Sequence, residues 1–163
     1  MGLCRWISRA MSVFIVSGLK IFSADPPIVP LSVCDVVRDL PAHEGKNVAV
    51  IGRYSFREAG RWVADQVCDP PVTVPPELWL LEDSKEGPKP PGNYELDGVA
   101  LQRKFNDLQR HTPLGKFRFG TPDYDRWVVI YGRVEPRKGD DTRKAAANLI
   151  FRGRGVIVFL TPE

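Results

Sequence analysis

Two β-branched runs, each ending in Gly-Arg, constrain the fold of this chain more than any other feature of its sequence. They are Val48-Ala49-Val50-Ile51-Gly52-Arg53 and Val128-Val129-Ile130-Tyr131-Gly132-Arg133. Valine, isoleucine and tyrosine favour extended backbone, so each run predicts a long strand. A glycine inside a strand indicates a bulge or a sharp coil, which a small barrel needs in order to close. We therefore expect the strand to coil at Gly52.

The segments around these runs predict three strands, then a helix, then two strands. The expected elements are a short helix capped by Ser32 and ended by Pro41, strands over 48–58, 61–68 and 78–81, a helix over 97–111, and strands over 127–136 and 149–160, the last with a bend at Gly153 and Gly155. This order is that of an OB-fold barrel. We expect a mainly β, OB-fold-like five-stranded barrel, order β-β-β-α-β-β, in a single domain over 31–163. The strand over 48–58 should be the longest, and the helix over 97–111 should plug one end of the barrel.

The first 24 residues have the layout of a secretory signal peptide. Two arginines precede an apolar run over 10–19, and Ser23-Ala24 precedes a proline-rich spacer over 25–30. We expect export to the periplasm or the medium, with cleavage near Ala24. Lys20 at the end of the apolar run departs from the pattern, so an uncleaved N-terminal anchor is the alternative, and it would be the chain's one route to a membrane.

The charge of the chain depends on this leader. Three of its 23 basic residues, Arg5, Arg9 and Lys20, lie in the first 24 positions, which hold no acidic residue. The remaining chain carries 20 basic and 20 acidic residues. A domain without net charge has no overall electrostatic attraction to polyanions, although a local basic stripe can still exist.

Cysteine usage gives a second indication of the compartment. Removal of the leader would remove Cys4 and leave Cys34 and Cys68. An even number of cysteines in an exported domain favours one disulfide, whereas in a cytosolic protein the same two residues would be buried free thiols. Neither cysteine has a second ligand at close spacing, so we expect no metal site.

A family resemblance rests on four sequence features between residues 31 and 82. They are Ser32-Val33-Cys34, Gly45-Lys46-Asn47-Val48 followed by Gly52, the second cysteine Cys68, and Leu78-Trp79-Leu80. In these features the chain resembles a family of small, exported, uncharacterised bacterial OB-fold-like proteins. The resemblance implies an OB-like barrel, an exported location and a Cys34–Cys68 bridge. The long insert over 84–121 and the loop after Pro136 depart from the family pattern, and the family supplies no activity to carry over.

A candidate ligand face mixes basic and aromatic residues on the expected strands. Its members are Arg53, Tyr54, Phe56, Arg57, Arg61, Trp62, Lys116, Phe117, Arg118 and Phe119. OB-folds often bind single-stranded nucleic acid on such cationic and aromatic surfaces. The alternative is plain strand alternation, with aromatic residues facing the core and arginines facing water. Gathering of the bases on one face would favour nucleic acid, and dispersal would favour the alternative.

Catalytic and metal-binding patterns are sparse. The two histidines, His43 and His111, each lie near a proline that ends a helix, where histidine complements the helix dipole. Asp123-Tyr124-Asp125 could ligate a metal, but the adjacent Gly120 and Pro122 favour a turn. The sequence contains no phosphate-binding loop and no Cys-x-x-Cys, and gives no reason to expect a cofactor.

These observations favour an exported, non-catalytic binding or structural module whose ligand or protein partner is unknown. One rival is a single-stranded nucleic-acid-binding OB-fold protein. The other is a hydrolase on an OB-like scaffold, which would need His43 or His111 in a cleft beside a nucleophile or a carboxylate.

Overall fold

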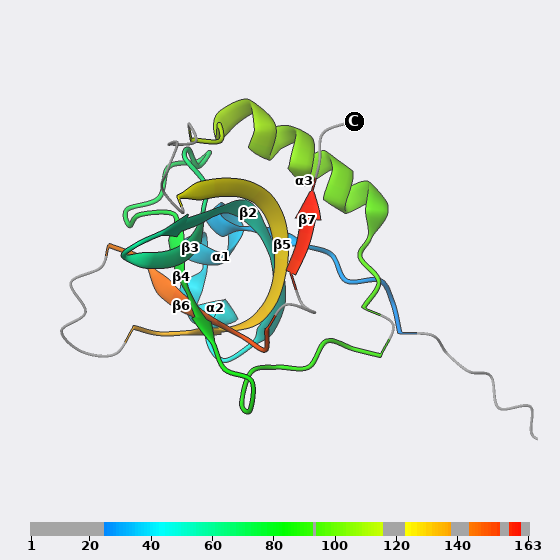
Figure 1. Cartoon of the computed structure of the whole chain (residues 1–163). Helices are drawn as coiled ribbons and strands as arrows, with labels where there is room; N and C mark the ends of the chain where they lie inside the picture. The colour runs from blue at the N-terminus through cyan, green and yellow to red at the C-terminus, as the bar shows by residue number, and fades with distance from the viewer. Residues whose placement is uncertain (1–24, 93, 116–122, 138–143, 154–156, 161–163) are drawn as a thin grey trace, which may run out of the picture.

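The structure is a computed structural model that describes residues 25–92, 94–115, 123–137, 144–153 and 157–160. It is mainly β, with a closed five-stranded barrel, two added strands and three helices in the described part (Figure 1). The elements are β1 (Leu31–Ser32), α1 (Val33–Arg38), α2 (Leu40–His43), β2 (Asn47–Arg57), β3 (Gly60–Ala64), β4 (Glu77–Glu82), α3 (Gly98–His111), β5 (Tyr124–Glu135), β6 (Ala147–Phe151) and β7 (Ile157–Leu160).

The barrel has the strand order expected from the sequence. Strands β2, β3, β4, β6 and β5 are neighbours in that order, and antiparallel pairing of β2 with β5 closes the ring. The β4–β6 pair is parallel, while the other pairs of the ring are antiparallel. The two Gly-Arg runs lie directly against each other, since Gly52 pairs with Val128 and Val48 pairs with Gly132. The fold prediction is confirmed.

The segment expected to form the last strand holds two strands, β6 and β7. Of the two glycines expected at a bend, Gly153 has a φ of 124° and Gly155 lies outside the described residues. Both β6 and β7 pair with β5, β6 near its C-terminal end and β7 near its N-terminal end. One expectation about length is wrong. The longest strand is β5, with 12 residues, and not β2, with 11.

Helix α1 begins as the sequence predicts. The Ser32 hydroxyl accepts a hydrogen bond from the Asp35 backbone N–H, and the Asp35 carboxylate accepts one from the Ser32 N–H, which completes a capping box. The prediction that Pro41 ends this helix is wrong. The helix ends at Arg38, and Pro41 lies in the first turn of α2, where the missing backbone N–H of proline costs no hydrogen bond.

The barrel core is formed by alternate residues of β2 and β5, and helices close one end of it. The residues that face the interior include Val50, Tyr54, Val128, Ile130 and Val134, all buried. Viewed down the barrel, α1 and α2 lie across one end of it (Figure 1). Buried valines of α1 join the core cluster, and a Cβ at Gly52 would lie 2.6 Å from Val63 Cγ2 and 3.0 Å from Val33 Cγ2. Pairing with β5 continues without interruption through Gly52, so the glycine is explained by the close approach of barrel wall and helix, which leaves no room for a side chain.

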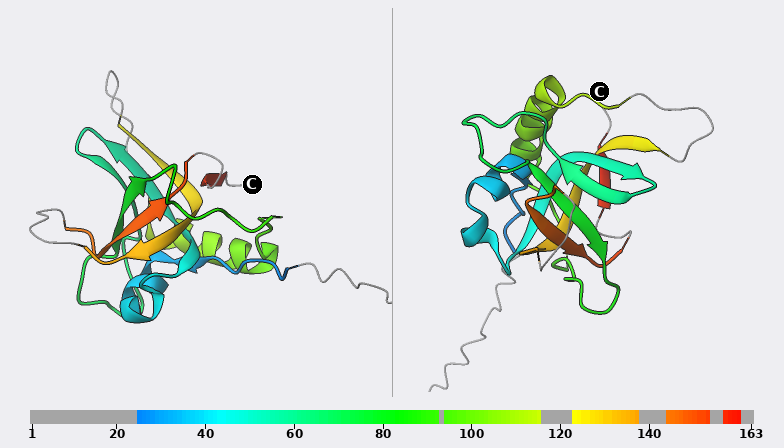
Figure 2. Two further views of the ribbon diagram at one scale, coloured as in Figure 1. Left: turned by 90° about the horizontal axis from the view of Figure 1, so that it is seen from below. Right: turned by 90° about the vertical axis from the view of Figure 1, so that its left-hand side faces the viewer.

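Helix α3 packs on the outside of the barrel and does not plug its end as expected. Phe105 meets Trp127 edge to face, with ring centroids 5.6 Å apart. Trp127 alternates with the inward-facing Val128, so it lies on the outer face of the sheet. Figure 1 shows α3 alongside the wall formed by β2 and β5, and both views of Figure 2 agree. The end of the barrel is closed by α1, which leaves α3 free to form one side of a groove.

Candidate ligand-binding groove

A groove of about 680 Å³ lies between α1, the segment after β3 and the polar side of α3. Four aspartates, four lysine or arginine residues and one histidine line it together with a few apolar and hydroxyl side chains. The lining residues are Ser32, Cys34, Asp35, Arg38, Ile51, Asp65, Val67, Asp69, Arg103, Lys104, Asn106, Asp107, Leu108, Arg110, His111 and Thr112. The volume is within the range of about 300–1,000 Å³ that is typical of small-molecule sites.

Asp65 is the most unusual group in the groove. It follows directly after β3, and only 9% of its surface is exposed. Its Oδ2 accepts a hydrogen bond of 3.0 Å from the Cys34 backbone N–H, while Oδ1 is buried and has no hydrogen-bond partner in the described part of the chain. Burial raises the pKa of Asp65 to about 6, an effect that the Cys34 N–H reduces and that the negative charges of Asp35 and Asp107 reinforce.

A second carboxylate of the groove, that of Asp35, already has partners for both of its oxygens. Asp35 Oδ2 lies 2.5 Å from Lys104 Nζ on α3, and its Oδ1 lies 3.6 Å from an Arg38 guanidinium nitrogen. Partial burial raises the pKa of Asp35, but the hydrogen bonds from Lys104 and Ser32 outweigh this effect and hold it below its usual value. The Asp35–Lys104 pair therefore ties α1 to α3 across the groove.

The expected disulfide lies beside the groove, whose lining includes Cys34. Cys34 and Cys68 are bonded, with Cα atoms 5.5 Å apart, and both are buried. Because Cys34 belongs to α1 and Cys68 to the segment after β3, the bond holds the end cap against the barrel. The Arg38 guanidinium adds hydrogen bonds to the carbonyl oxygens of Asp69 and Pro70 in the same segment.

One of the two histidines lies in this groove. His111 is in the last turn of α3, and its Nδ1 lies 3.5 Å from Asp107 Oδ1, on an exposed surface. The hydroxyls that also line the groove already accept hydrogen bonds: Ser32 caps α1, and Thr112 Oγ1 accepts from the Gln66 N–H. His43 ends α2, outside the groove. His111 lies next to the Asp107 carboxylate, but the Ser32 and Thr112 hydroxyls that share the groove already have structural roles.

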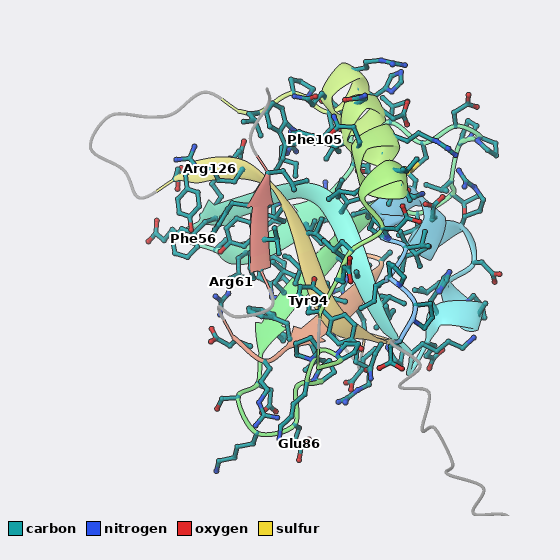
Figure 3. All side chains as sticks on the ribbon, turned by 90° about the vertical axis from the view of Figure 1, so that its right-hand side faces the viewer. Phe56, Arg61, Glu86, Tyr94, Phe105 and Arg126 are labelled. Carbon is teal, nitrogen blue, oxygen red and sulfur yellow. A yellow bond between two sulfur atoms is a disulfide. The ribbon has the colours of Figure 1, made fainter. Side chains whose placement is uncertain are left out.

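The described bases of the predicted ligand face do not gather on one surface. Arg53 and Arg57 lie on the outer face of β2, whereas Arg61 of β3 pairs with the inward-facing Phe56. Arg53 donates a hydrogen bond to the Pro113 carbonyl, and Arg61 pairs with Glu82 at 2.8 Å. Figure 3 shows Phe56, Arg61 and Arg126 toward the end of the barrel opposite α1.

The aromatic members of the predicted face also divide between the two sides of the sheet. Tyr54 and Phe56 face inward, where both pack against Tyr124. Trp62 alternates with inward-facing residues of β3 and stacks on Trp79 outside, with centroids 5.6 Å apart. The four other members, Lys116, Phe117, Arg118 and Phe119, lie outside the described residues.

Gly120 and Pro122, which favoured a turn before Asp123, lie outside the described residues, but Asp125 is described and has a structural role. Asp125, on the outer face of β5, accepts from Arg57 at 2.6 Å and from the Gly115 N–H at 2.6 Å. Burial raises the pKa of Asp125, and the hydrogen bonds from Arg57, Ser55 and Gly115 outweigh it, so that the pKa lies below its usual value. In the described part, no group of three or more histidine, cysteine or acidic side chains is arranged to hold a metal ion.

Comparison with known proteins finds no match: no protein-family model, no curated protein and no solved structure is significantly similar to this chain. Among the described residues, no helix is long and apolar enough to cross a membrane.

The groove was not foreseen from the sequence. Its charges on α3 occur three, four and seven residues apart, which is also the pattern of an ordinary solvated helix face. Asp65 offered one signal, since it is an acidic residue inside the strand expected over 61–68. Only the docking of α3 beside α1 shows that these residues share a site.

Asp65 should make the chain less stable as the pH rises from about 4 to about 6. Its carboxyl binds a proton more tightly in the folded state than in the unfolded state. As the pH rises through this window, the unfolded state loses that proton first, so the free energy of unfolding falls. A shift of about two pKa units corresponds to a fall of about 3 kcal/mol. Urea titrations at several pH values should show this slope in the native chain and a flatter one in Asp65→Asn.

Other carboxyl groups with shifted pKa values also affect how stability changes with pH. Glu77 also has a raised pKa through burial, so some slope should remain in the variant. The lowered pKa values of Asp35 and Asp125 act below about pH 4 and have the opposite sign. Asp69→Asn, at an exposed position of the same groove, should keep the native slope. Equal slopes in Asp65→Asn and the native chain would contradict the prediction.

Proposed function

We propose that this chain is an exported, non-catalytic binding module and that its ligand occupies the groove between α1 and α3. The observation that carries the proposal is the buried Asp65 carboxyl at the groove wall, with Oδ1 unpartnered. Buried polar atoms in folded proteins are almost always hydrogen-bonded, and an exception calls for a specific explanation. A ligand that supplies the missing donor is such an explanation.

Export is supported by the Cys34–Cys68 bond and by the layout of the first 24 residues. Disulfides persist mainly in oxidising compartments. The resemblance to small, exported OB-fold-like proteins agrees with this location. Mass spectrometry of the protein from its native host should find a mature N-terminus near Asp25, and an intact Met1 in the cytosolic fraction would count against export.

Single-stranded nucleic acid is the less favoured ligand. Arg57 and Arg61 are already paired with Asp125 and Glu82, so neither is available to neutralise a phosphate without breaking an ion pair. The chain after residue 24 has no net charge to attract a polyanion. We expect any such binding to be weak and to fall steeply with salt.

A fragment screen by two-dimensional NMR on the oxidised chain would test the proposal. Fragments that bind should shift the amide signals of groove residues such as Cys34, Asp65 and Thr112. The variant Asn106→Trp should weaken their binding about tenfold or more, because a large side chain would occupy the groove and exclude contacts that give most of the affinity.

The matched control is Gln102→Trp. Gln102 and Asn106 are exposed on the same helix and bond to each other, so both variants remove the same hydrogen bond, but only Asn106 lines the groove. Gln102→Trp should keep the native affinity. Binding that maps to the opposite end of the barrel, or equal effects of the two variants, would overturn the assignment of the groove.

A further inference from the structure

We infer that the ligand of the groove places a single protonated amine against Asp65 and carries an anionic group at its other end, as a free amino acid or a short peptide does. This inference rests on the proposed function, because it names the ligand class for the same groove. Asp65 supplies the acceptor, since one of its oxygens is bonded to the Cys34 N–H and the other, Oδ1, has no partner among the described residues. An ammonium group can donate the missing hydrogen bond and neutralise the carboxylate together.

The charges around Asp65 favour a cation at this position. Asp35 and Asp107 both act on Asp65 electrostatically as like charges, and Lys104 is the one base that acts on it in the opposite sense. Lys104 is itself paired with Asp35 at 2.5 Å, so its charge is shared with a second carboxylate. A carboxylate or phosphate placed there would meet repulsion and lose its hydration, so the acidic end of a ligand must lie elsewhere.

The other end of the ligand is indicated by the bases of α3. Arg103 and Arg110 line the groove and make no hydrogen bond or ion pair with another described residue. They are seven residues apart, which places them on one side of the helix about 10 Å from each other. Guanidinium groups bind carboxylates in a bidentate manner, and they would repel a polyamine or another polycation. The groove thus combines a cation site beside Asp65 with an anion site beside Arg103 and Arg110.

A ligand reaches Asp65 Oδ1 only after a local shift, because this atom is buried although the residue keeps 9% of its surface exposed and lines the groove. Lys104 acts electrostatically on Asp65, and its ion pair with Asp35 is partly exposed. A ligand amine takes over the role of Lys104 beside the carboxylates, so its binding should shift the signals of Lys104 as well as those of Asp65.

The test uses the oxidised full chain and a mixture of amino acids and dipeptides with free termini, screened by NMR. The best binder is then compared with its N-acetylated and C-amidated forms. We expect N-acetylation, which removes the charged amine, to weaken binding about tenfold or more. Amidation removes the charged carboxylate and should weaken binding by a smaller factor. Asp65→Asn should weaken the free-amine ligand about tenfold and leave the weaker binding of the acetylated form unchanged.

The control is Glu58→Gln, which removes an exposed carboxylate outside the groove, in the turn between β2 and β3, and should change affinity less than about twofold. If the acetylated ligand binds the native chain as well as the free amine does, the inference is overturned, and this arm decides even if Asp65→Asn fails to fold. If neutral fragments bind the groove and no amine-bearing ligand does, the ligand class is wrong while the proposed function stands. If nothing binds the groove, both fail.

Discussion

Replacing Cys34 and Cys68 together with serine is expected to lower the free energy of unfolding by about 3–4 kcal/mol. The bond closes a loop between residues 34 positions apart, and a loop of this size restricts the unfolded chain by about that amount in the chain-entropy account. The loss should be large for this domain because the bond attaches the end cap α1 to the barrel. Urea unfolding of the native and variant chains, followed by tryptophan fluorescence, measures it.

The same effect should follow from chemical reduction. Adding a reducing agent to the native chain should move its unfolding midpoint to that of the double variant, and the agent should not move the midpoint of the double variant itself. A native chain whose midpoint is the same with and without reductant would show that the bond contributes nothing to stability. Both cysteines are buried, so we do not expect that outcome.

Truncating Leu149 to alanine is expected to lower the free energy of unfolding by about 2–5 kcal/mol. Leu149 lies on β6 with no exposed surface and faces the barrel interior between β4 and β5. Its side chain packs over Gly132, where a Cβ would lie only 2.8 Å from Leu149 Cγ. Gly132 has no side chain that could turn into the space left by Leu149.

Thermal and urea unfolding of Leu149→Ala should be compared with Phe159→Ala. Phe159 is a larger apolar residue on β7, but 57% of its surface is exposed, so its truncation should change stability by no more than about 0.5 kcal/mol. A loss below about 1 kcal/mol in Leu149→Ala would mean that the interior can collapse around the missing atoms, and the described packing of the barrel would then be in doubt.

The parts of the fold that could be predicted depend on local chemistry. The β-branched runs predicted β2 and β5, and the two-residue gap between the strands expected over 48–58 and 61–68 predicted the hairpin. The side chain of Ser32 predicted the start of α1, and the apolar spacing over 97–111 predicted α3. In each case neighbouring residues decide the backbone conformation through propensity, turn geometry or capping. The strand order then followed because few topologies accommodate this sequence of elements.

The parts that could not be predicted depend on how elements dock. The apolar faces of α1 and α3 look alike in sequence, and only packing decides that Val33 closes the barrel end while Phe105 lies on its outer wall. The described members of the expected ligand face are divided between two sides for a related reason. Arg57 pairs with Gly60 and Arg61 pairs with Phe56, so alternation places Arg57 and Arg61 on opposite sides of the sheet.

The parallel pairing of β4 with β6 also affects how the chain reaches its folded state. The ring cannot close until residues 147–151 have found both β4 and β5, so every shorter nascent chain leaves two strand edges open. Contacts between segments so distant in sequence form slowly. Under the export proposed above, this delay would keep the chain extended enough to cross a membrane until β6 is complete. Its open edges during that time would need the protection of a chaperone or of rapid transit.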